Sequence, residues 1–450
     1  MTHRLSENIF KEYEKKTPGS RKLYQEAKNL FPGGVQHNIR FFEPYPFYVT
    51  RAKGQHLYDV DGNEYTDHWM GHMALILGHT PRPIVKALAE QVPNGTHFGV
   101  VNTKQLELGR KVHELVPCAE MVRFCCSGTE ATMYASRLAR GYTRRRVILK
   151  IEGGWHGGNP TLHKAVTNPY DKSDSLGMLE EETRYTKTIR FNDLEDARRQ
   201  IHENASDLAM VLVEPMMGSG AIPGEAGYLR GLREETEKVG AILAFDEVIT
   251  GFRLGLGGAQ EYYGVRPDIC TLGKILGGGM PIGAICGRKD ILSVADPTKP
   301  VPKNEKVWIG GGTFSGNPMT MTAGLAMLQT LSEGKATIYA RINRYTERAR
   351  KGIDRIFDQH GVPTSTTGLG SLFLTHFLKD SHLKVRSPGE RIANTDRELQ
   401  HLYYISMVAT HDVFFLPEHT GTFSFAHTRA DLERLLEATE AFAKRLKDKR

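Results

Sequence analysis

Two short stretches in the middle of the chain decide the fold: AFDEV at residues 244–248 and TLGKILGGGMP at residues 271–281. Each contains a short apolar run typical of a buried parallel strand, and a charged residue follows the run, Asp246 in one and Lys274 in the other. In open α/β sheets the carboxyl ends of the strands form the crevice that binds ligands. Charged side chains are costly to bury there without a task. The two stretches therefore predict a parallel sheet with an acid and a lysine at its ligand-binding edge.

The same pattern extends to both sides of these stretches. Short apolar runs alternate with amphipathic segments, and the runs cover residues 121–126, 147–151, 208–213, 241–245, 269–272 and 282–286. This alternation predicts an α/β fold whose mostly parallel central sheet is covered by helices on both faces. The flanking sequence predicts a smaller α+β domain built from both chain ends. We expect residues 1–65 and 321–450 to form this small domain and residues 66–320 to form the large one.

Composition excludes several classes of protein. The chain has 450 residues, of which 40% are hydrophobic and 25% charged, as is usual for a two-domain enzyme. No apolar segment is long enough to span a bilayer, and the charged N-terminus does not resemble a secretory signal. The five cysteines lie mostly in apolar runs and predict free thiols, so we expect a cytoplasmic protein. The net charge of +7 is spread along the chain without a basic stripe, which argues against nucleic-acid binding.

The acid and the lysine suggest one particular chemistry. A partly desolvated lysine can lose its proton and form a Schiff base with a carbonyl group. An aspartate beside it suits the protonated ring nitrogen of pyridoxal phosphate. From Asp246 and Lys274 alone, an ordinary ion pair at the edge of the sheet is an equally good interpretation.

Three further segments bear on this choice. Ser127-Gly128-Thr129 stands where a strand turns into a helix, which favours either a phosphate site or a simple helix cap. Trp155, in the glycine-rich segment 152–158, suits either stacking on a planar ring or packing in the core. The glycines of segment 310–318 permit close approach to a phosphate or to a neighbouring subunit. The sequence contains no P-loop, dinucleotide-binding or zinc motif, so we expect no metal.

In their order and spacing these segments resemble the class III (ω-) aminotransferases of the fold-type I pyridoxal-phosphate enzymes. Within that family the likeness is greatest to the glutamate-1-semialdehyde 2,1-aminomutase group. The resemblance runs from FPGGV at residues 31–35 to FSFAH at residues 423–427 and is most specific in DEVITGFR at residues 246–253. It implies pyridoxal 5′-phosphate as cofactor and a homodimer with shared active sites.

The resemblance also implies roles around the cofactor ring. Lys274 would form the Schiff base and move the proton, and Asp246 would hold the proton of the pyridine nitrogen. Val248 would pack against the ring, and Trp155 would stack on it in place of the usual tyrosine. Glu214 would lie near the hydroxyl side of the cofactor.

Other residues would bind the phosphate and the substrate. Ser127, Gly128 and Thr129 would hold the phosphate, and Thr313 would reach the phosphate of the neighbouring subunit's cofactor. Arg40 matches the aminomutase arginine that receives the substrate carboxylate. From the residues alone, Arg40 is equally suited to a surface ion pair with Glu43.

The chain departs from the aminomutase pattern in its pocket. Cys126 replaces the family's usual asparagine, which is a tolerated change, whereas Gly71-His72 stands where aminomutases carry a Ser-Trp pair and segment 416–421 also differs. These departures favour a ping-pong aminotransferase acting between an amino acid, with β-amino, D- or aryl-amino acids as candidates, and a 2-oxo acid. The alternatives are the intramolecular aminomutase, an epimerase or other relative, and a catalytically silent binding protein of the same fold.

Overall fold

The computed structural model describes residues 2–172 and 174–447. Residue contacts divide the chain into two compact units. Unit 1 comprises Met1–Pro81, Ala340–Val385 and Ala393–Arg450, and unit 2 comprises Arg82–Tyr339 and Arg386–Ile392. Both chain ends thus belong to unit 1, and the unit boundaries lie at residues 81/82, 339/340, 385/386 and 392/393.

Unit 2 contains a seven-stranded sheet, whose strands are fully buried except β4 and β6. In spatial order the strands are β4 (Met121–Cys125), β12 (Gly283–Gly287), β11 (Ile269–Gly273), β10 (Ile242–Asp246), β7 (Leu208–Val213), β5 (Val147–Ile151) and β6 (Thr186–Ile189). Neighbouring strands from β11 to β6 are parallel, and β12 runs antiparallel to both β11 and β4. This arrangement confirms the predicted mostly parallel sheet. A hairpin of β8 (Met216–Met217) and β9 (Ile222–Pro223) follows β7.

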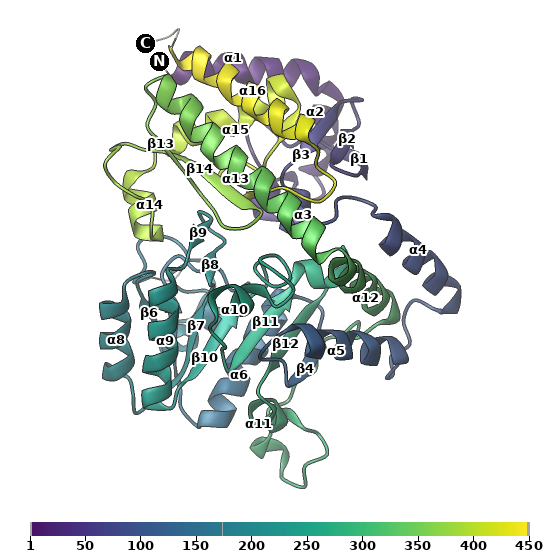
Figure 1. The fold of residues 1–450 in the computed structure, drawn as a ribbon, viewed down its shortest axis with the longest axis vertical. Coiled ribbons are helices and arrows are strands. Elements are labelled where there is room, and N and C mark those ends of the chain that lie inside the picture. The colour runs from purple at the N-terminus through teal and green to yellow at the C-terminus, as the bar shows by residue number, and fades with distance from the viewer. Residues whose placement is uncertain (1, 173, 448–450) are drawn as a thin grey trace. The chain divides into compact units, whose positions relative to one another are not determined.

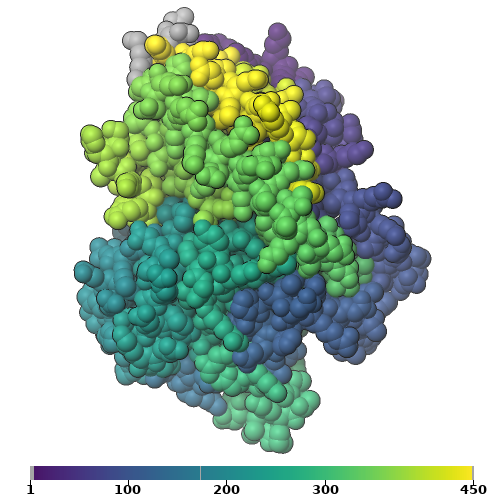
Figure 2. All heavy atoms as spheres, viewed as in Figure 1, coloured from purple at the N-terminus to yellow at the C-terminus, as the bar shows by residue number. Residues whose placement is uncertain are grey.

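Helices pack against this sheet and against one another. Those of unit 2 are α4 (Arg82–Gln91), α5 (Thr103–Leu115), α6 (Gly128–Thr143), α7 (Glu180–Thr183), α8 (Leu194–Glu203), α9 (Ala226–Val239), α10 (Gly258–Tyr263), α11 (Lys289–Leu292) and α12 (Pro318–Glu333). Helices α8 and α9 lie side by side, and α12 packs against α4 and α5 (Figure 1). Apolar residues of α6 such as Ala131 and Leu138 join Leu212 and Ala244 of the sheet in the core. The segment that begins at α11 protrudes from the surface of this unit (Figure 2).

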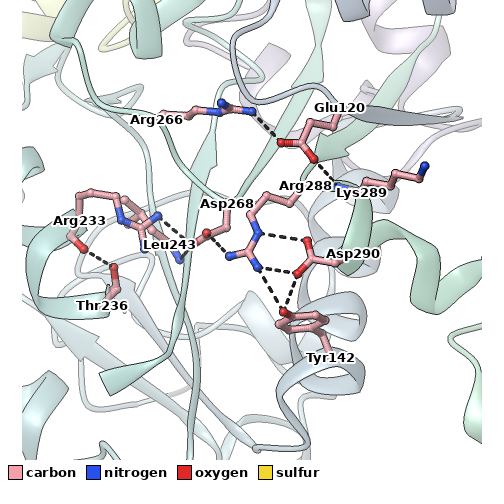
Figure 3. Close-up of polar contacts among 10 residues, drawn as sticks. All are labelled: Glu120, Tyr142, Arg233, Thr236, Leu243, Arg266, Asp268, Arg288, Lys289 and Asp290. Carbon is pink, nitrogen blue, oxygen red and sulfur yellow. Dashed lines mark hydrogen bonds and ion pairs between the residues drawn. The ribbon is translucent and has the colours of Figure 1, made fainter. Parts of the chain in front are cut away.

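The amino ends of the central strands are held by a network of ion pairs (Figure 3). Asp268, just before β11, accepts hydrogen bonds from Arg233 and Arg288 at 2.9 Å each and from the backbone N–H of Leu243 at 2.8 Å. Arg266 pairs with Glu120 at 2.9 Å, just before β4. Because Asp268 is almost buried, its two arginine partners compensate for the cost of removing its charge from water. The network fixes the edge of the sheet opposite to Asp246.

Unit 1 is built from two small sheets and several long helices. Its strands are β1 (Val49–Lys53), β2 (His56–Asp59), β3 (Glu64–Asp67) and β15 (Val413–Phe414) in one sheet, and β13 (Thr364–Thr367), β14 (Leu372–Phe377) and β16 (Gly421–Thr422) in the other. The helices include α1 (Thr2–Lys16), α2 (Pro18–Ala27), the short turn α3 (Met70–Met73), α15 (Arg397–His411) and α16 (Arg429–Lys447). Helices α1 and α16 lie side by side, with Arg445 paired to Glu12 at 3.0 Å (Figure 1).

Two helices lie at the unit boundaries. Helix α13 (Lys335–Gln359) contains the boundary at residues 339/340, and α14 (Pro388–Asn394) contains the boundary at residues 392/393. Throughout the part of the chain that the structure describes, none of the helices combines the length and apolarity needed to cross a membrane.

Candidate functional site

The carboxyl edge of the unit 2 sheet gathers the polar residues that the sequence singles out. Lys274 follows β11 directly, and Asp246 ends the neighbouring strand β10, opposite Thr271 in the register. Burial lowers the pKa of the Lys274 ammonium group, while the carboxylates of Asp246 and Glu214 act in the opposite direction. Lys274 also adopts a left-handed backbone conformation with φ of 45°, which is uncommon for a residue with a side chain. The fold therefore holds a partly buried amine of lowered pKa beside an acid.

Asp246 is fixed by three hydrogen-bond donors. His156 Nδ1 lies 2.7 Å from Asp246 Oδ2, while Thr271 Oγ1 and the backbone N–H of Val248 donate to Oδ1 at 3.0 and 3.1 Å. Burial lowers the pKa of His156, so its ring is neutral, and Nδ1 carries the hydrogen that Asp246 accepts. The other ring nitrogen of His156, Nε2, is buried and has no hydrogen-bond partner among the described residues.

Glu214, which follows β7, is the second acid at this edge. Its Oε1 accepts the backbone N–H of Trp155 at 3.0 Å, and its Oε2 accepts that of Gly218 at 2.8 Å. Burial raises the pKa of Glu214 to about 7, with the nearby charge of Asp246 as the next cause. Glu214 can therefore hold or release a proton near neutral pH.

A buried lysine supports the glycine-rich loop at residues 152–158. Lys150 Nζ, on strand β5, donates to the carbonyl oxygens of Gly154 at 2.8 Å and Lys164 at 2.6 Å. The loop presents the Trp155 side chain, which is 48% exposed and contacts His163 edge to face. Trp155 is thus no core residue in this unit, and its indole face is accessible.

The N-terminus of α6 completes this edge. Ser127 is the N-cap: its hydroxyl accepts the backbone N–H of Glu130 at 3.2 Å and donates to the Glu130 carboxylate at 3.1 Å. The next residue, Gly128, packs closely on Val248, because a Cβ there would lie 3.1 Å from Val248 Cγ2. A Cβ on Gly157 would lie only 2.2 Å from Thr129 Oγ1. The helix end therefore offers backbone N–H groups beside small residues.

Two predicted site residues lie elsewhere. Thr313 is exposed in the loop after residue 307, which is held by hydrogen bonds from Gly311 N–H to Tyr134 Oη at 3.1 Å and from Cys126 Sγ to Gly311 O at 3.4 Å. Arg40 belongs to unit 1, where it lines a cavity of about 510 Å³. It makes no ion pair with any described residue, so the alternative pairing with Glu43 is not observed.

The sequence analysis assigned no role to three residues that the structure brings to this edge. His156 and Thr271 donate to Asp246, and Lys150 supports the loop that carries His156. His156 lies in segment 152–158 and Thr271 in segment 271–281, both of which the sequence singled out. Nothing in the sequence indicated that their side chains contact Asp246. Across residues 2–172 and 174–447, no group of three or more His, Cys, Asp or Glu side chains is placed to hold a metal ion.

Comparison with known proteins identifies relatives over nearly the whole chain. The family model described as aminotransferase class-III matches residues 41–409. A glutamate-1-semialdehyde 2,1-aminomutase from Methanosphaera stadtmanae is 40% identical over 425 residues, which is 94% of this chain and 97% of the relative. A β-phenylalanine aminotransferase from Variovorax paradoxus has a similar structure, with a TM-score of 0.88 and 31% identity over 99% of this chain and 98% of its own. A transaminase solved with pyridoxal phosphate bound has a TM-score of 0.87 and 30% identity, covering 96% of this chain and 99% of its own.

These findings confirm pyridoxal phosphate as the cofactor, and the residues at the carboxyl edge fit it. The set combines a buried amine, a fixed carboxylate and a helix N-terminus, which match the aldehyde, the ring nitrogen and the phosphate of the cofactor. The absence of a Cβ at Gly128 and Gly157 lets Val248 and Thr129 pack directly against the backbone at this edge.

The comparisons correct one expectation. The interpretation as an intermolecular aminotransferase is wrong, because curated relatives of 37–43% identity carry the name glutamate-1-semialdehyde 2,1-aminomutase. The departures at residues 71–72 and 416–421 do not exclude an aminomutase, because they leave the lysine, its acid and the helix N-terminus unchanged.

Proposed function

Because the chain belongs to the class-III aminotransferase family, we propose that it is a glutamate-1-semialdehyde 2,1-aminomutase, which moves an amino group within one substrate molecule. The observation that carries this proposal is the 40% identity to such an enzyme over 94% of this chain. The buried amine of Lys274 at the sheet edge is consistent with it, since the reaction needs one group that carries a proton between two carbons of the same substrate.

The atoms of the reaction define what the protein must do. Glutamate-1-semialdehyde has an aldehyde at C1, an amino group at C2 and a carboxylate at the far end. When the amino group moves to C1 and the carbonyl to C2, the product is 5-amino-4-oxopentanoate, an isomer. C2 loses its hydrogen and C1 gains one, so the net change needs no external amino donor or acceptor. Pyridoxal phosphate, when bound, supplies the electron sink that makes such C–H protons removable.

In this proposal Lys274 Nζ is the group that moves the proton. Burial lowers its pKa, which makes the free amine easier to form. Asp246 holds a proton on the ring nitrogen of the cofactor, and His156 and Thr271 keep its carboxylate in one orientation. Glu214, whose pKa is about 7, would lie near the ring hydroxyl of the bound cofactor.

The remaining assignments concern binding. The backbone N–H groups at Ser127, Gly128 and Thr129 would hold the phosphate, because helix N-termini favour anions. Trp155 would stack on the ring, and Val248, already packed on Gly128, would contact its other face.

Two assignments reach beyond this edge of the sheet. Arg40 would bind the carboxylate of the substrate, for which its lack of an ion-pair partner leaves it available. The exposed position of Thr313 is compatible with a homodimer in which it reaches the partner's phosphate site. Both remain part of the proposal.

The test is isomerisation by the holoenzyme without any oxo acid or added amine. We expect NMR to show glutamate-1-semialdehyde converting to 5-amino-4-oxopentanoate at a rate proportional to enzyme. Lys274→Ala should abolish this conversion, and Lys289→Ala, which removes an exposed lysine ammonium, should not. The proposal fails if the holoenzyme forms no isomer, or forms it only when an external amino acceptor is supplied.

A further inference from the structure

Lys150 is a fully buried lysine on strand β5, and none of the roles assigned above requires its charge. The strand is buried along its whole length and lies between β7 and β6 in the sheet. A cation in such a place is costly unless acceptors replace the water that it loses. An apolar side chain of the same length would fill this space without that cost. The charge of Lys150 therefore points to a task for its ammonium group.

The acceptors of this ammonium group lie at the two ends of the loop that follows β5. Lys150 Nζ donates to the carbonyl oxygen of Gly154 at 2.8 Å, where the loop begins. It also donates to the carbonyl oxygen of Lys164 at 2.6 Å, where the chain returns. Beside these contacts, the backbone N–H of Gly153 donates to the carbonyl oxygen of Ala165 at 2.8 Å. Lys150 thus ties the beginning of the loop to its end.

Between its two ends, the loop makes three contacts with the carboxyl edge of the sheet and with α6. The backbone N–H of Trp155 donates to Glu214 at 3.0 Å, and His156 Nδ1 lies 2.7 Å from Asp246 Oδ2. The carbonyl oxygen of His156 accepts the hydroxyl of Thr132 at 2.6 Å. All three contacts depend on where the backbone of two adjacent residues lies. A shift of the loop would therefore disturb them together.

Gly154 connects the lysine to the imidazole. A Cβ on Gly154 would lie 3.0 Å from His156 Nε2, 3.0 Å from the carbonyl oxygen of Ile151 and 3.7 Å from Glu214 Oε1. The backbone of Gly154 is therefore packed directly against the His156 ring and lies close to the second acid of the site. Because the carbonyl group of the same residue accepts from Lys150, the ammonium group holds the piece of backbone on which the imidazole rests.

The charge of Lys150 also acts on His156. Burial is the largest cause of the lowered pKa of the His156 ring, and the positive charge of Lys150 acts in the same direction, against the effect of Asp246. A neutral ring donates its Nδ1 hydrogen and brings no positive charge of its own. The carboxylate of Asp246 then keeps its full charge for the ring nitrogen of the cofactor. Burial lowers the pKa of Lys150 itself to about 8, so Lys150 is mostly protonated at neutral pH.

We propose that Lys150 is a positioning residue for the cofactor: its buried ammonium group fixes the loop after β5 so that His156 meets Asp246 and Trp155 faces the ring of pyridoxal phosphate. It acts through the two carbonyl oxygens of the loop and not on the reacting atoms. The inference rests on the proposed function for the roles of Asp246 and Trp155 toward the cofactor. It does not depend on whether the amino group moves within one substrate or between two.

The first measurement is the affinity of the apoprotein for pyridoxal phosphate, titrated by the absorbance of the bound cofactor. Lys150→Met removes the ammonium group from a side chain of similar length, and Lys150→Gln keeps an N–H donor without the charge. Lys187→Met, at an exposed lysine of the neighbouring strand β6, is the matched control. We expect Kd to rise by about tenfold or more in Lys150→Met, by less in Lys150→Gln, and to stay within twofold in the control.

The second measurement reads the loop without cofactor or turnover. The chain has three tryptophans, so apoprotein labelled with 5-fluorotryptophan gives three fluorine NMR signals, and Trp155→Phe assigns one of them. We expect Lys150→Met to shift or broaden the Trp155 signal and to leave those of Trp69 and Trp308 in place. A loss of stability spread over the whole protein would not single out one signal.

The third measurement separates positioning from a general structural role. In a background that lacks both side chains of the loop, Trp155→Ala with His156→Phe, Lys150→Met should change Kd for the cofactor by less than threefold, because the groups through which it acts are gone. The inference is overturned if Lys150→Met binds cofactor within twofold of the wild type, if its Trp155 signal is unchanged, or if its loss of affinity is equally large in that background. Should Lys150→Met not fold, the same criteria apply to Lys150→Gln. An enzyme that meets them but fails to isomerise glutamate-1-semialdehyde would refute only the proposed function.

Discussion

Replacing His156 by phenylalanine tests whether the buried imidazole fixes Asp246 for its task. The two groups meet at 2.7 Å, and the His156 side chain is fully buried, so water cannot replace the lost donor. A hydrogen bond to a charged group contributes about 1.5–3 kcal/mol. If that contribution is made in the transition state, kcat/KM for isomerisation falls by roughly 10- to 150-fold. Phenylalanine fills similar space and removes the unpartnered Nε2, so we expect the fold to survive.

The assay is steady-state isomerisation by the holoenzyme, with cofactor content measured by absorbance after dialysis and stability by thermal melting. Thr271→Val is the matched comparison, since it removes the hydroxyl donor at 3.0 Å from the other oxygen of Asp246. Because this hydroxyl donates to the same charged carboxylate, Thr271→Val should also lower kcat/KM by about tenfold or more. The reasoning is refuted if His156→Phe retains its cofactor and its kcat/KM stays within threefold of the wild type.

Four other changes give distinct readouts. Lys274→Ala should lower the isomerisation rate by about 10²–10⁴-fold or more while the purified protein still binds cofactor, because it removes the proton carrier; near-normal turnover would contradict the assignment. Arg40→Lys keeps the charge but loses the planar fork, so KM for glutamate-1-semialdehyde should rise by about tenfold or more, whereas a loss of thermal stability in the same variant would point to a folding defect. Asp268→Ala leaves Arg233 without its carboxylate partner, while Arg288 keeps Asp290, and should lower the free energy of unfolding by about 3–5 kcal/mol in denaturant titration, against little change for the more exposed Asp290→Ala. Burial lowers the pKa of His68 from 6.5 to about 4, so as the pH falls the unfolded chain binds a proton at this residue before the folded chain does. The free energy of unfolding should therefore fall by about 3 kcal/mol between pH 6.5 and pH 4. His68→Phe should reduce this pH dependence.

The residues at the carboxyl edge of the sheet could be predicted because the pattern that marks a strand end is local in the sequence. A charged residue directly after an apolar run of strand length lies at a strand end whatever the rest of the fold does, and this placed Asp246 and Lys274 correctly. The partners of these residues depend on tertiary contacts. His156 lies 90 residues from Asp246 along the chain, and nothing in segment 152–158 indicates which acid its ring will face.

Two other features were out of reach for different physical reasons. The left-handed turn at Met70–Met73 is set by Asp67 and His79 rather than by local propensity, since only one of its residues is glycine. The choice between transfer within one substrate and transfer between two was also out of reach, because both reactions use the same buried amine, fixed acid and phosphate site. The departures at residues 71–72 lie in the wall of a cavity in unit 1 and leave that shared chemistry untouched.

The cap at the start of α6 has a consequence for how this site tolerates mutation over evolutionary time. The hydroxyl of Ser127 and the carboxylate of Glu130 bind each other, so the side chains at this turn are occupied by the helix itself. What the turn offers to an anion is main chain, which no single substitution can delete. Residue 127 should therefore tolerate substitution by other residues that cap helices well. Gly157 should stay invariant, because any side chain there would collide with Thr129. A deep mutational scan of this turn should thus show that substitutions are rejected when the new side chain does not fit the space, and tolerated when it fits, whatever its chemical type.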